Sequence, residues 1–145
     1  MTPVAGAVAQ PVGRPPTIVA RPTILLVEDE RDLVTALTTH LETQGFAVVA
    51  AADGMAGLAA AREAAPQLIL LDLMLPGLDG YRVLKHLKTH EQYQRIPIVV
   101  TTARAGSRDL ELAFEAGADA CLVKPVQVET LLATIRMLLA PPASE

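Results

Sequence analysis

Six polar residues of this chain lie at the ends of short apolar runs or directly after them, and their types suit metal and phosphate chemistry. They are Glu28, Asp29, Asp72, Thr101, Thr102 and Lys124. Carboxylates brought close together repel one another, which raises their pKa values unless a cation lies between them. Oxygen ligands with no histidine or cysteine nearby suit Mg²⁺ rather than zinc. We therefore expect a magnesium site if the fold brings the three carboxylates together.

A carboxylate can also act as a nucleophile and form an aspartyl phosphate. Asp72 is the candidate because it follows the unbroken apolar run 68–71, and Gly77 and Gly80 shape an open loop beyond it. Mg²⁺ and Lys124 together balance the charge of the three carboxylates, so an incoming phosphoryl group would meet a neutral, polarising site. A threonine hydroxyl adds a further donor, and phosphoryl transfer needs mainly such positioning and charge stabilisation.

The run 68–71 also predicts the element that positions Asp72. A short apolar run bounded by turn residues is typical of a strand that is buried on both faces of a parallel sheet. Here the bounding turn residues are Pro76, Gly77 and Gly80. In open parallel sheets the ligand site lies just beyond the carboxyl ends of the strands. Asp72 is therefore expected at the edge where a ligand would bind.

Further apolar runs predict strands at 23–27, 46–51, 96–103 and 120–123, and apolar residues at helical spacing predict a helix after each strand. The expected apolar faces of these helices are Leu33, Leu37 and Leu41; Met55, Leu58 and Ala59; Tyr81, Leu84 and Leu87; Leu110, Ala113 and Phe114; and Val128, Leu131, Leu132, Ile135, Leu138 and Leu139. This alternation predicts an α/β fold with right-handed crossovers. We expect a flavodoxin-like (βα)5 doubly wound parallel sheet with strand order 2-1-3-4-5, which makes strands 1 and 3 neighbours.

Composition restricts the function further. The chain has 145 residues, 51% of them apolar, and we expect one globular domain at 23–140 between a disordered Pro- and Ala-rich tail at 1–22 and a short tail at 141–145. The net charge of -4 argues against direct nucleic-acid binding. Cys121 is the only cysteine, which excludes an internal disulfide. No apolar run is long enough for a membrane helix and no signal peptide is recognised, so we expect a cytoplasmic protein.

Four motifs in a consistent order, LLVEDE, LILLDLMLPGLDG, VVTTA and LVKP, resemble the receiver domain of two-component response regulators over about residues 23–140. The resemblance implies that Asp72 is the phosphoacceptor. It also implies that Asp29 binds Mg²⁺ directly, that Glu28 acts largely through water, and that Met74 gives its backbone carbonyl to the metal.

The same resemblance assigns roles to the later motifs. Thr102 matches the hydroxyl that moves onto the phosphoryl group, with Thr101 as the alternative one residue away, and Lys124 matches the phosphate-binding lysine. Pro125 implies a cis peptide after Lys124. The family usually has Tyr or Phe three residues before the lysine, whereas this chain has Cys121, which we interpret as a core residue. In the family this aromatic ring swings inward as the threonine moves, so we expect that part of the family's conformational switch to be missing here.

Two side chains are expected to tune how long the phosphate lasts. We hypothesise that Met74 hinders the attacking water and that Arg104 reaches the phosphoryl oxygens. The resulting interpretation is a stand-alone, non-enzymatic signalling phosphoacceptor. It takes a phosphoryl group from a sensor histidine kinase or histidine phosphotransfer protein and acts on an unknown downstream protein as a monomer or weak dimer. The alternatives are a phosphorylation-independent interaction module and a small phosphatase; the phosphatase ranks last because Met74 stands where a general acid would help.

Overall fold

The computed structural model describes residues 21–77 and 79–140, and most of the expected tails at 1–22 and 141–145 lies outside these ranges. The strands are β1 (Thr23–Val27), β2 (Ala47–Ala51), β3 (Leu68–Asp72), β4 (Ile98–Thr102) and β5 (Ala120–Val123). The helices are α1 (Arg31–Thr43), α2 (Gly54–Ala64), α3 (Gly80–Thr89), α4 (Ser107–Glu115) and α5 (Val128–Leu139). Within the described ranges, none of the helices is both long enough and apolar enough to cross a lipid bilayer.

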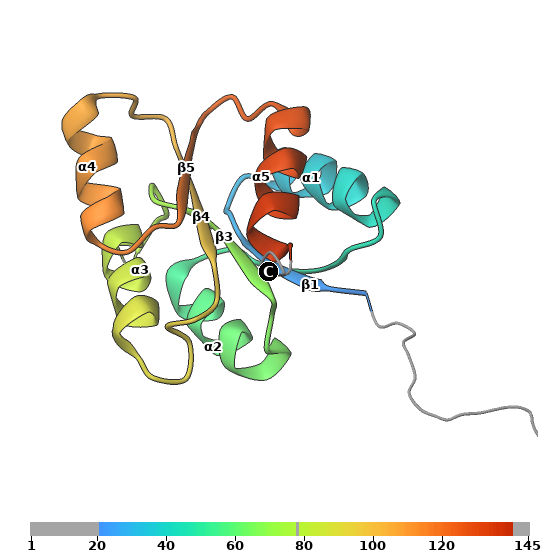
Figure 1. The fold of residues 1–145 in the computed structure, drawn as a ribbon, viewed down its shortest axis with the longest axis horizontal. Coiled ribbons are helices and arrows are strands. Elements are labelled where there is room, and N and C mark those ends of the chain that lie inside the picture. Colours follow the sequence, from blue (N-terminus) through green and yellow to red (C-terminus); the bar gives the residue numbers. More distant parts are fainter. Residues whose placement is uncertain (1–20, 78, 141–145) are drawn as a thin grey trace, which may run out of the picture.

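The strands form a single parallel sheet in the order β2-β1-β3-β4-β5, which confirms the predicted flavodoxin-like topology (Figure 1). Every residue of β3 and β4 is buried, because helices cover both faces of the sheet. A strand buried on both faces reads as an unbroken apolar run, and this explains why the sequence of β3 predicted its central position.

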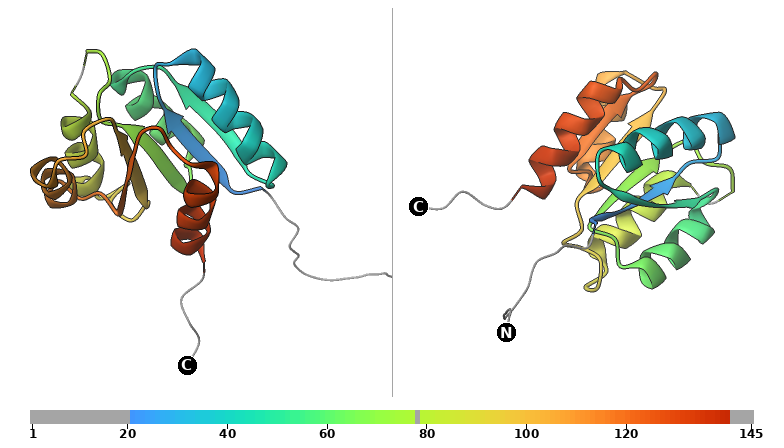
Figure 2. Two further views of the ribbon diagram at one scale, coloured as in Figure 1. Left: turned by 90° about the horizontal axis from the view of Figure 1, so that it is seen from above. Right: turned by 90° about the vertical axis from the view of Figure 1, so that its right-hand side faces the viewer.

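Two apolar clusters hold the helices against the sheet. One face is covered by α2, α3 and α4, whose buried residues join alternate residues of β1, β3 and β4. The opposite face is covered by α1 and α5, which bury Leu37, Leu41, Leu131 and Ile135 against the remaining strand residues. Figure 1 and Figure 2 show the same two groups of helices on either side of the sheet.

The expected apolar face of α2 is partly wrong, although Leu58 does pack against the core cluster. Met55 is 67% exposed and Ala59 is exposed, whereas the buried residues of α2 are Gly54, Gly57 and Ala61. The helix lies so close to β1 that a Cβ at Gly57 would come within 3.0 Å of the Val27 side chain. Small residues allow this approach, and the large side chain of Met55 faces outward.

The expected face of α4 is also partly wrong. Ala113 is fully buried and Leu110 is half-buried, but Phe114 is 52% exposed. In α5, by contrast, the predicted stripe is confirmed: Leu131 and Ile135 are buried, and Leu132 packs against the same cluster.

The start of α3 approaches the loop that follows Asp72. A Cβ at Gly80 would lie 2.6 Å from both the Cα and the carbonyl oxygen of Leu73, so only glycine allows this approach. The Asp79 carboxylate accepts a hydrogen bond from the backbone N–H of Tyr81 at 2.9 Å and caps the helix. These contacts position the short loop between β3 and α3 beside the carboxyl edge of the sheet.

Candidate functional site

The three carboxylates that the sequence singled out do meet at one edge of the sheet. Residue Val27 of β1 lies opposite Leu71 of β3, so Glu28 and Asp72 leave neighbouring strands at the same level. Carboxylate oxygens of Glu28, Asp29 and Asp72 all lie within 4.8 Å of one another. The side chains of Glu28 and Asp72 are each 3% exposed, whereas Asp29 is exposed to solvent.

Lys124 reaches this cluster from the far side of β4. Its Nζ donates to Glu28 Oε1 at 2.9 Å and to Asp72 Oδ2 at 3.2 Å. Its backbone N–H donates to the carbonyl of Thr102 at 2.8 Å, which extends the pairing of β5 with β4 up to the site. The Lys124–Pro125 peptide is cis, as predicted.

Burial and charge shape the ionisation of this group. Burial raises the pKa of the Glu28 carboxyl, and nearby Asp72 acts in the same direction, while the hydrogen bond from Lys124 opposes both. Burial by itself would lower the pKa of the Lys124 ammonium, but its hydrogen bonds and charge attraction to Glu28 and Asp72 prevail and raise that pKa above 10.5. Lys124 is therefore a cation at neutral pH.

The charges of the cluster fit a divalent cation. Three carboxylates and one ammonium leave two negative charges, two of the carboxylates are almost fully buried, and all offer oxygen ligands. Buried charges normally have a balancing partner, and Mg²⁺ prefers carboxylate oxygens. The donor set present here therefore fits Mg²⁺.

The loop after β3 also contacts Asp72. The backbone N–H of Met74 donates to Asp72 Oδ1 at 2.8 Å, while the Met74 side chain is 46% exposed. Both Asp72 carboxylate oxygens thus have hydrogen-bond donors, one from this loop and one from Lys124.

Both candidate threonines are buried at the end of β4. Thr101 pairs with Asp72 across the sheet, and its carbonyl accepts a hydrogen bond from the Leu73 N–H at 3.0 Å. The Thr102 hydroxyl oxygen accepts a hydrogen bond from the backbone N–H of Arg104 at 3.0 Å. Thr102 thus contacts the loop that leads from β4 to α4, and the Arg104 side chain is exposed.

Cys121 lies in β5, half-buried against the cluster that includes α3 and α4. Burial raises the pKa of its thiol, which disfavours the reactive thiolate form. This placement supports the interpretation of Cys121 as a packing residue.

Tyr81 has a contact that the sequence did not predict. Its ring joins the same cluster, and its hydroxyl donates to the carbonyl of Asp109 in α4 at 3.4 Å. Burial raises the pKa of the Tyr81 hydroxyl, and the Asp109 carboxylate adds to this shift. Because the two residues are separated by 28 positions in the chain, no local pattern could reveal the contact.

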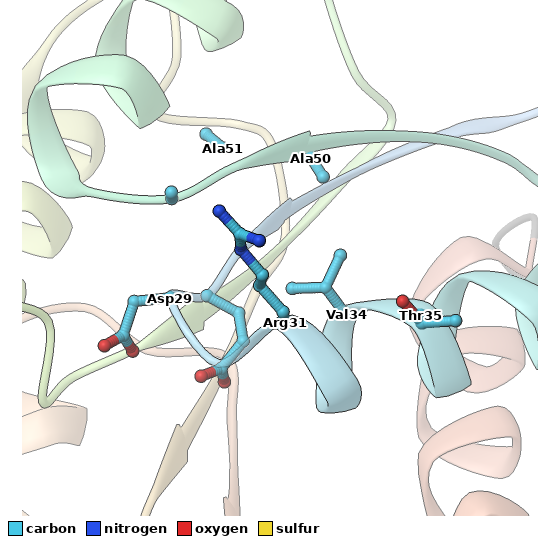
Figure 3. A pocket seen from close by; sticks show the side chains of 8 residues that line it. Asp29, Arg31, Val34, Thr35, Ala50 and Ala51 are labelled. Carbon is cyan, nitrogen blue, oxygen red and sulfur yellow. The ribbon is translucent and has the colours of Figure 1, made fainter.

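A small pocket opens beside the carboxylates between α1 and β2. Its volume is about 300 Å³. Figure 3 shows Arg31 and Val34 of α1 on one side of it and Ala50 and Ala51 of β2 on the other. Local sequence patterns do not reveal this pocket, because it depends on the distance between a helix and an edge strand.

Comparisons with known proteins agree with this geometry. Residues 24–136 match the family described as the response regulator receiver domain. The transcriptional regulatory protein AfsQ1 of Streptomyces coelicolor is 44% identical over 118 residues, which are 81% of this chain and 51% of that protein. The DNA-binding response regulator MtrA of Mycobacterium tuberculosis is 40% identical over 116 residues, which are 80% of this chain and 50% of that protein. The chain thus spans about half the length of these curated relatives.

Solved structures show the same fold. A putative response regulator from Chloroflexus aurantiacus has a TM-score of 0.79 at 30% identity, covering 83% of this chain and 99% of its own. The receiver domain of the sensor histidine kinase PA1611 from Pseudomonas aeruginosa, which has a magnesium ion coordinated in its active-site cleft, has a TM-score of 0.77 at 32% identity, covering 84% and 100%. Together with the family match across most of the chain, these likenesses show that this protein belongs to the response regulator receiver domain family.

Proposed function

We propose that this receiver domain accepts a phosphoryl group on Asp72 from a phosphohistidine of a sensor histidine kinase or histidine phosphotransfer protein. The observation that carries the proposal is the convergence of Glu28, Asp29, Asp72 and Lys124 at the carboxyl edge of the sheet. The phosphorylated form then signals by altered binding to a downstream protein.

The reaction is a transfer of a phosphoryl group between two nucleophiles. An oxygen of the Asp72 carboxylate forms a bond to phosphorus while the phosphorus–nitrogen bond of the donor imidazole breaks. The electron pair of the broken bond goes to the imidazole nitrogen, and the product on this chain is an aspartyl phosphate. Lys124 Nζ, now 3.2 Å from Asp72 Oδ2, then donates to a phosphoryl oxygen instead.

Mg²⁺ fits the chemistry of this carboxylate group. Asp29 and Asp72 would bind it directly, Glu28 through water, and Met74 through its backbone carbonyl. When bound, Mg²⁺ supplies positive charge that stabilises the phosphoryl oxygens during transfer. The domain catalyses only its own phosphorylation and dephosphorylation, so it is a signalling phosphoacceptor rather than an enzyme acting on other substrates.

Thr102 would relay the phosphorylation to the rest of the molecule. Its hydroxyl oxygen accepts from the Arg104 N–H, which leaves its proton available for a phosphoryl oxygen. Turning toward the phosphoryl group would break that local hydrogen bond and release the loop before α4. Because Cys121 replaces an aromatic side chain, the relay would pass through this backbone movement.

The test is phosphorylation with a small donor in the presence of Mg²⁺. Acetyl phosphate should add one phosphoryl group to the protein, as measured by intact mass, and beryllium fluoride should shift the amide NMR signals of the β4–α4 loop. Asp72→Asn should abolish both effects, whereas Asp32→Asn, an exposed aspartate on α1, should retain them.

The alternative is a phosphorylation-independent interaction module, and Cys121 is the observation that favours it. If Asp72→Asn and the natural protein behave identically toward both reagents and bind the downstream partner equally well, the phosphoacceptor proposal is wrong and the alternative stands.

The lifetime of the phosphate gives a second test of the site. Met74 is 46% exposed beside Asp72, where its side chain can hinder an attacking water. Because asparagine would remove this hindrance, we expect Met74→Asn to speed phosphate loss by roughly tenfold. This factor corresponds to an activation barrier that is lower by about 1.4 kcal/mol. Arg104→Ala should also shorten the lifetime, and an unchanged rate in both variants would remove these two tuning roles.

The domain arrangement, cellular location and oligomeric state of the protein are also proposals. Since the chain spans about half of AfsQ1 and MtrA, the stand-alone arrangement stays a prediction, as do the cytoplasmic location and the monomeric or weakly dimeric state. We expect residues 23–140 themselves to make no direct nucleic-acid contact, because the net charge of the chain is -4.

A further inference from the structure

A groove lies between α3 and α4, on the face of the sheet that these helices share. Its volume is about 550 Å³, and it is distinct from the carboxylate site. The residues that line it are Tyr81, Arg82, Lys85 and Thr89 of α3, Leu112 and Glu115 of α4, and Ala116.

Apolar surface inside the groove is available for contact. Tyr81 and Ala116 are half-buried, and Leu112 is 37% exposed although leucine is usually buried. The hydroxyl of Tyr81 donates to the carbonyl of Asp109, which ties the two helices together at this point. The groove therefore has an apolar floor that an apolar side chain of another molecule can cover.

The α3 wall of the groove is basic. Arg82 and Lys85 are exposed and lie three positions apart, so they project from the same side of the helix. Within the part of the chain that the structure describes, neither forms an ion pair. On the opposite wall, Glu115 already pairs with Arg108 at 3.7 Å. The uncompensated charge of the groove is thus positive, in a protein whose net charge is -4.

We propose that this groove binds an acidic amphipathic helical segment of a partner protein. The apolar side chains of the segment would cover Tyr81 and Leu112, and its carboxylates would pair with Arg82 and Lys85. An amphipathic helix in a groove is a common mode of peptide recognition. A nucleic acid fits less well, because its phosphates would meet Glu115 and leave the apolar floor uncovered.

The residues of the groove are separate from those of the phosphoacceptor site. None of the residues that line the groove belongs to the carboxylate cluster or contacts Lys124. Asp72→Asn should therefore bind the acidic segment as well as the unphosphorylated natural protein does, so failure of the phosphoacceptor proposal and failure of this one are distinguishable.

The probe is a fluorescent synthetic peptide of about sixteen residues, roughly four helical turns, with leucines along one face and glutamates beside them. A second peptide with lysines in place of the glutamates is the charge control. Binding to the full chain is measured by fluorescence anisotropy, and the contact surface is located by amide NMR shifts. The variants are Arg82→Glu with Lys85→Glu, and a matched double reversal, Arg62→Glu with Arg95→Glu, at exposed positions outside the groove.

We expect the acidic peptide to bind, to shift the amides of α3 and α4, and to lose about tenfold in affinity in the groove variant, which equals about 1.4 kcal/mol. The matched variant should lose less than about twofold, and the basic peptide should not bind. Absence of binding by the acidic peptide, or equal loss in both double variants, would overturn the proposal. If a single-stranded oligonucleotide binds the groove more tightly than the peptide does, the surface serves nucleic acid and the proposal is also wrong.

Discussion

Helices α4 and α5 flank the same edge strand, β5, but they are held to the molecule in different ways. Helix α5 buries Leu131 and Ile135 almost completely, and the half-buried Leu132 packs beside them. Helix α4 buries only Ala113, while Leu112 is 37% and Phe114 is 52% exposed. Apolar residues of α4 therefore lie largely outside the core, whereas those of α5 form a stripe against the sheet, so α5 is the more firmly held helix.

The difference identifies the part of the fold that can move at low cost. Segments with few buried apolar contacts open with small free energies, and switching elements come from such segments. The loop that leads to α4 follows Thr102, whose hydroxyl accepts a hydrogen bond from the Arg104 N–H within that loop. The loop that leads to α5 begins at Lys124, whose ammonium is held by two carboxylates. The movement of Thr102 that we propose on phosphorylation would therefore act on α4, the helix with the smaller buried apolar surface.

The largest effect should come from removing a buried side chain of α5. Ile135→Ala should lower the free energy of unfolding by about 3 to 5 kcal/mol, because it leaves a cavity in a well-packed cluster. The matched change in α4, Phe114→Ala, should cost less than about 1 kcal/mol, because that ring is 52% exposed. Urea unfolding of both variants measures the contrast, and equal losses would contradict the distinction between the two helices.

An intermediate effect is expected at the lysine that leads into the firmly held helix. Without Mg²⁺, Lys124→Met should lower the free energy of unfolding by about 2 to 3 kcal/mol at neutral pH. This is less than breaking a fully buried pair costs, because the Lys124 side chain is 22% exposed.

The effect of Lys124 should depend on pH in a defined direction. Since folding raises the pKa of Lys124, its contribution is fully present below its ordinary pKa of 10.5 and is lost as the pH rises through the folded value. The stability difference between the natural protein and Lys124→Met, measured in EDTA from pH 7 upward, should therefore shrink above about pH 10.5. A difference that grows with pH would show that the ammonium is not the stabilising form.

The smallest effect concerns the hydrogen bond between α3 and α4. At 3.4 Å the Tyr81–Asp109 bond is long, so Tyr81→Phe should cost only about 0.5 kcal/mol, at the low end for a hydrogen bond. That loss should speed hydrogen exchange of α4 amides by about twofold and leave α5 amides unchanged. If exchange increases equally in both helices, the bond does not serve α4 specifically.

Much of the fold and the candidate site followed from local patterns. The five strands, their order and the polar residues at their ends were predicted because buried parallel strands are continuous apolar runs whose carboxyl ends meet at one edge. The faces of α2 and α4 were predicted wrongly at Met55, Ala59 and Phe114. Helical spacing defines a stripe, but the distance between helix and sheet decides whether large or small residues fill the contact.

The sequence by itself determined which residues end each strand, because that depends on short apolar runs and the turn residues that stop them. Only the tertiary structure decided which of these residues touch. Lys124 donates hydrogen bonds to Asp72, 52 positions away in the chain, and to Glu28, 96 positions away. The groove between α3 and α4 likewise exists only because the two helices lie beside each other. Such contacts depend on how the packed helices and strands are spaced, which no single stretch of sequence specifies.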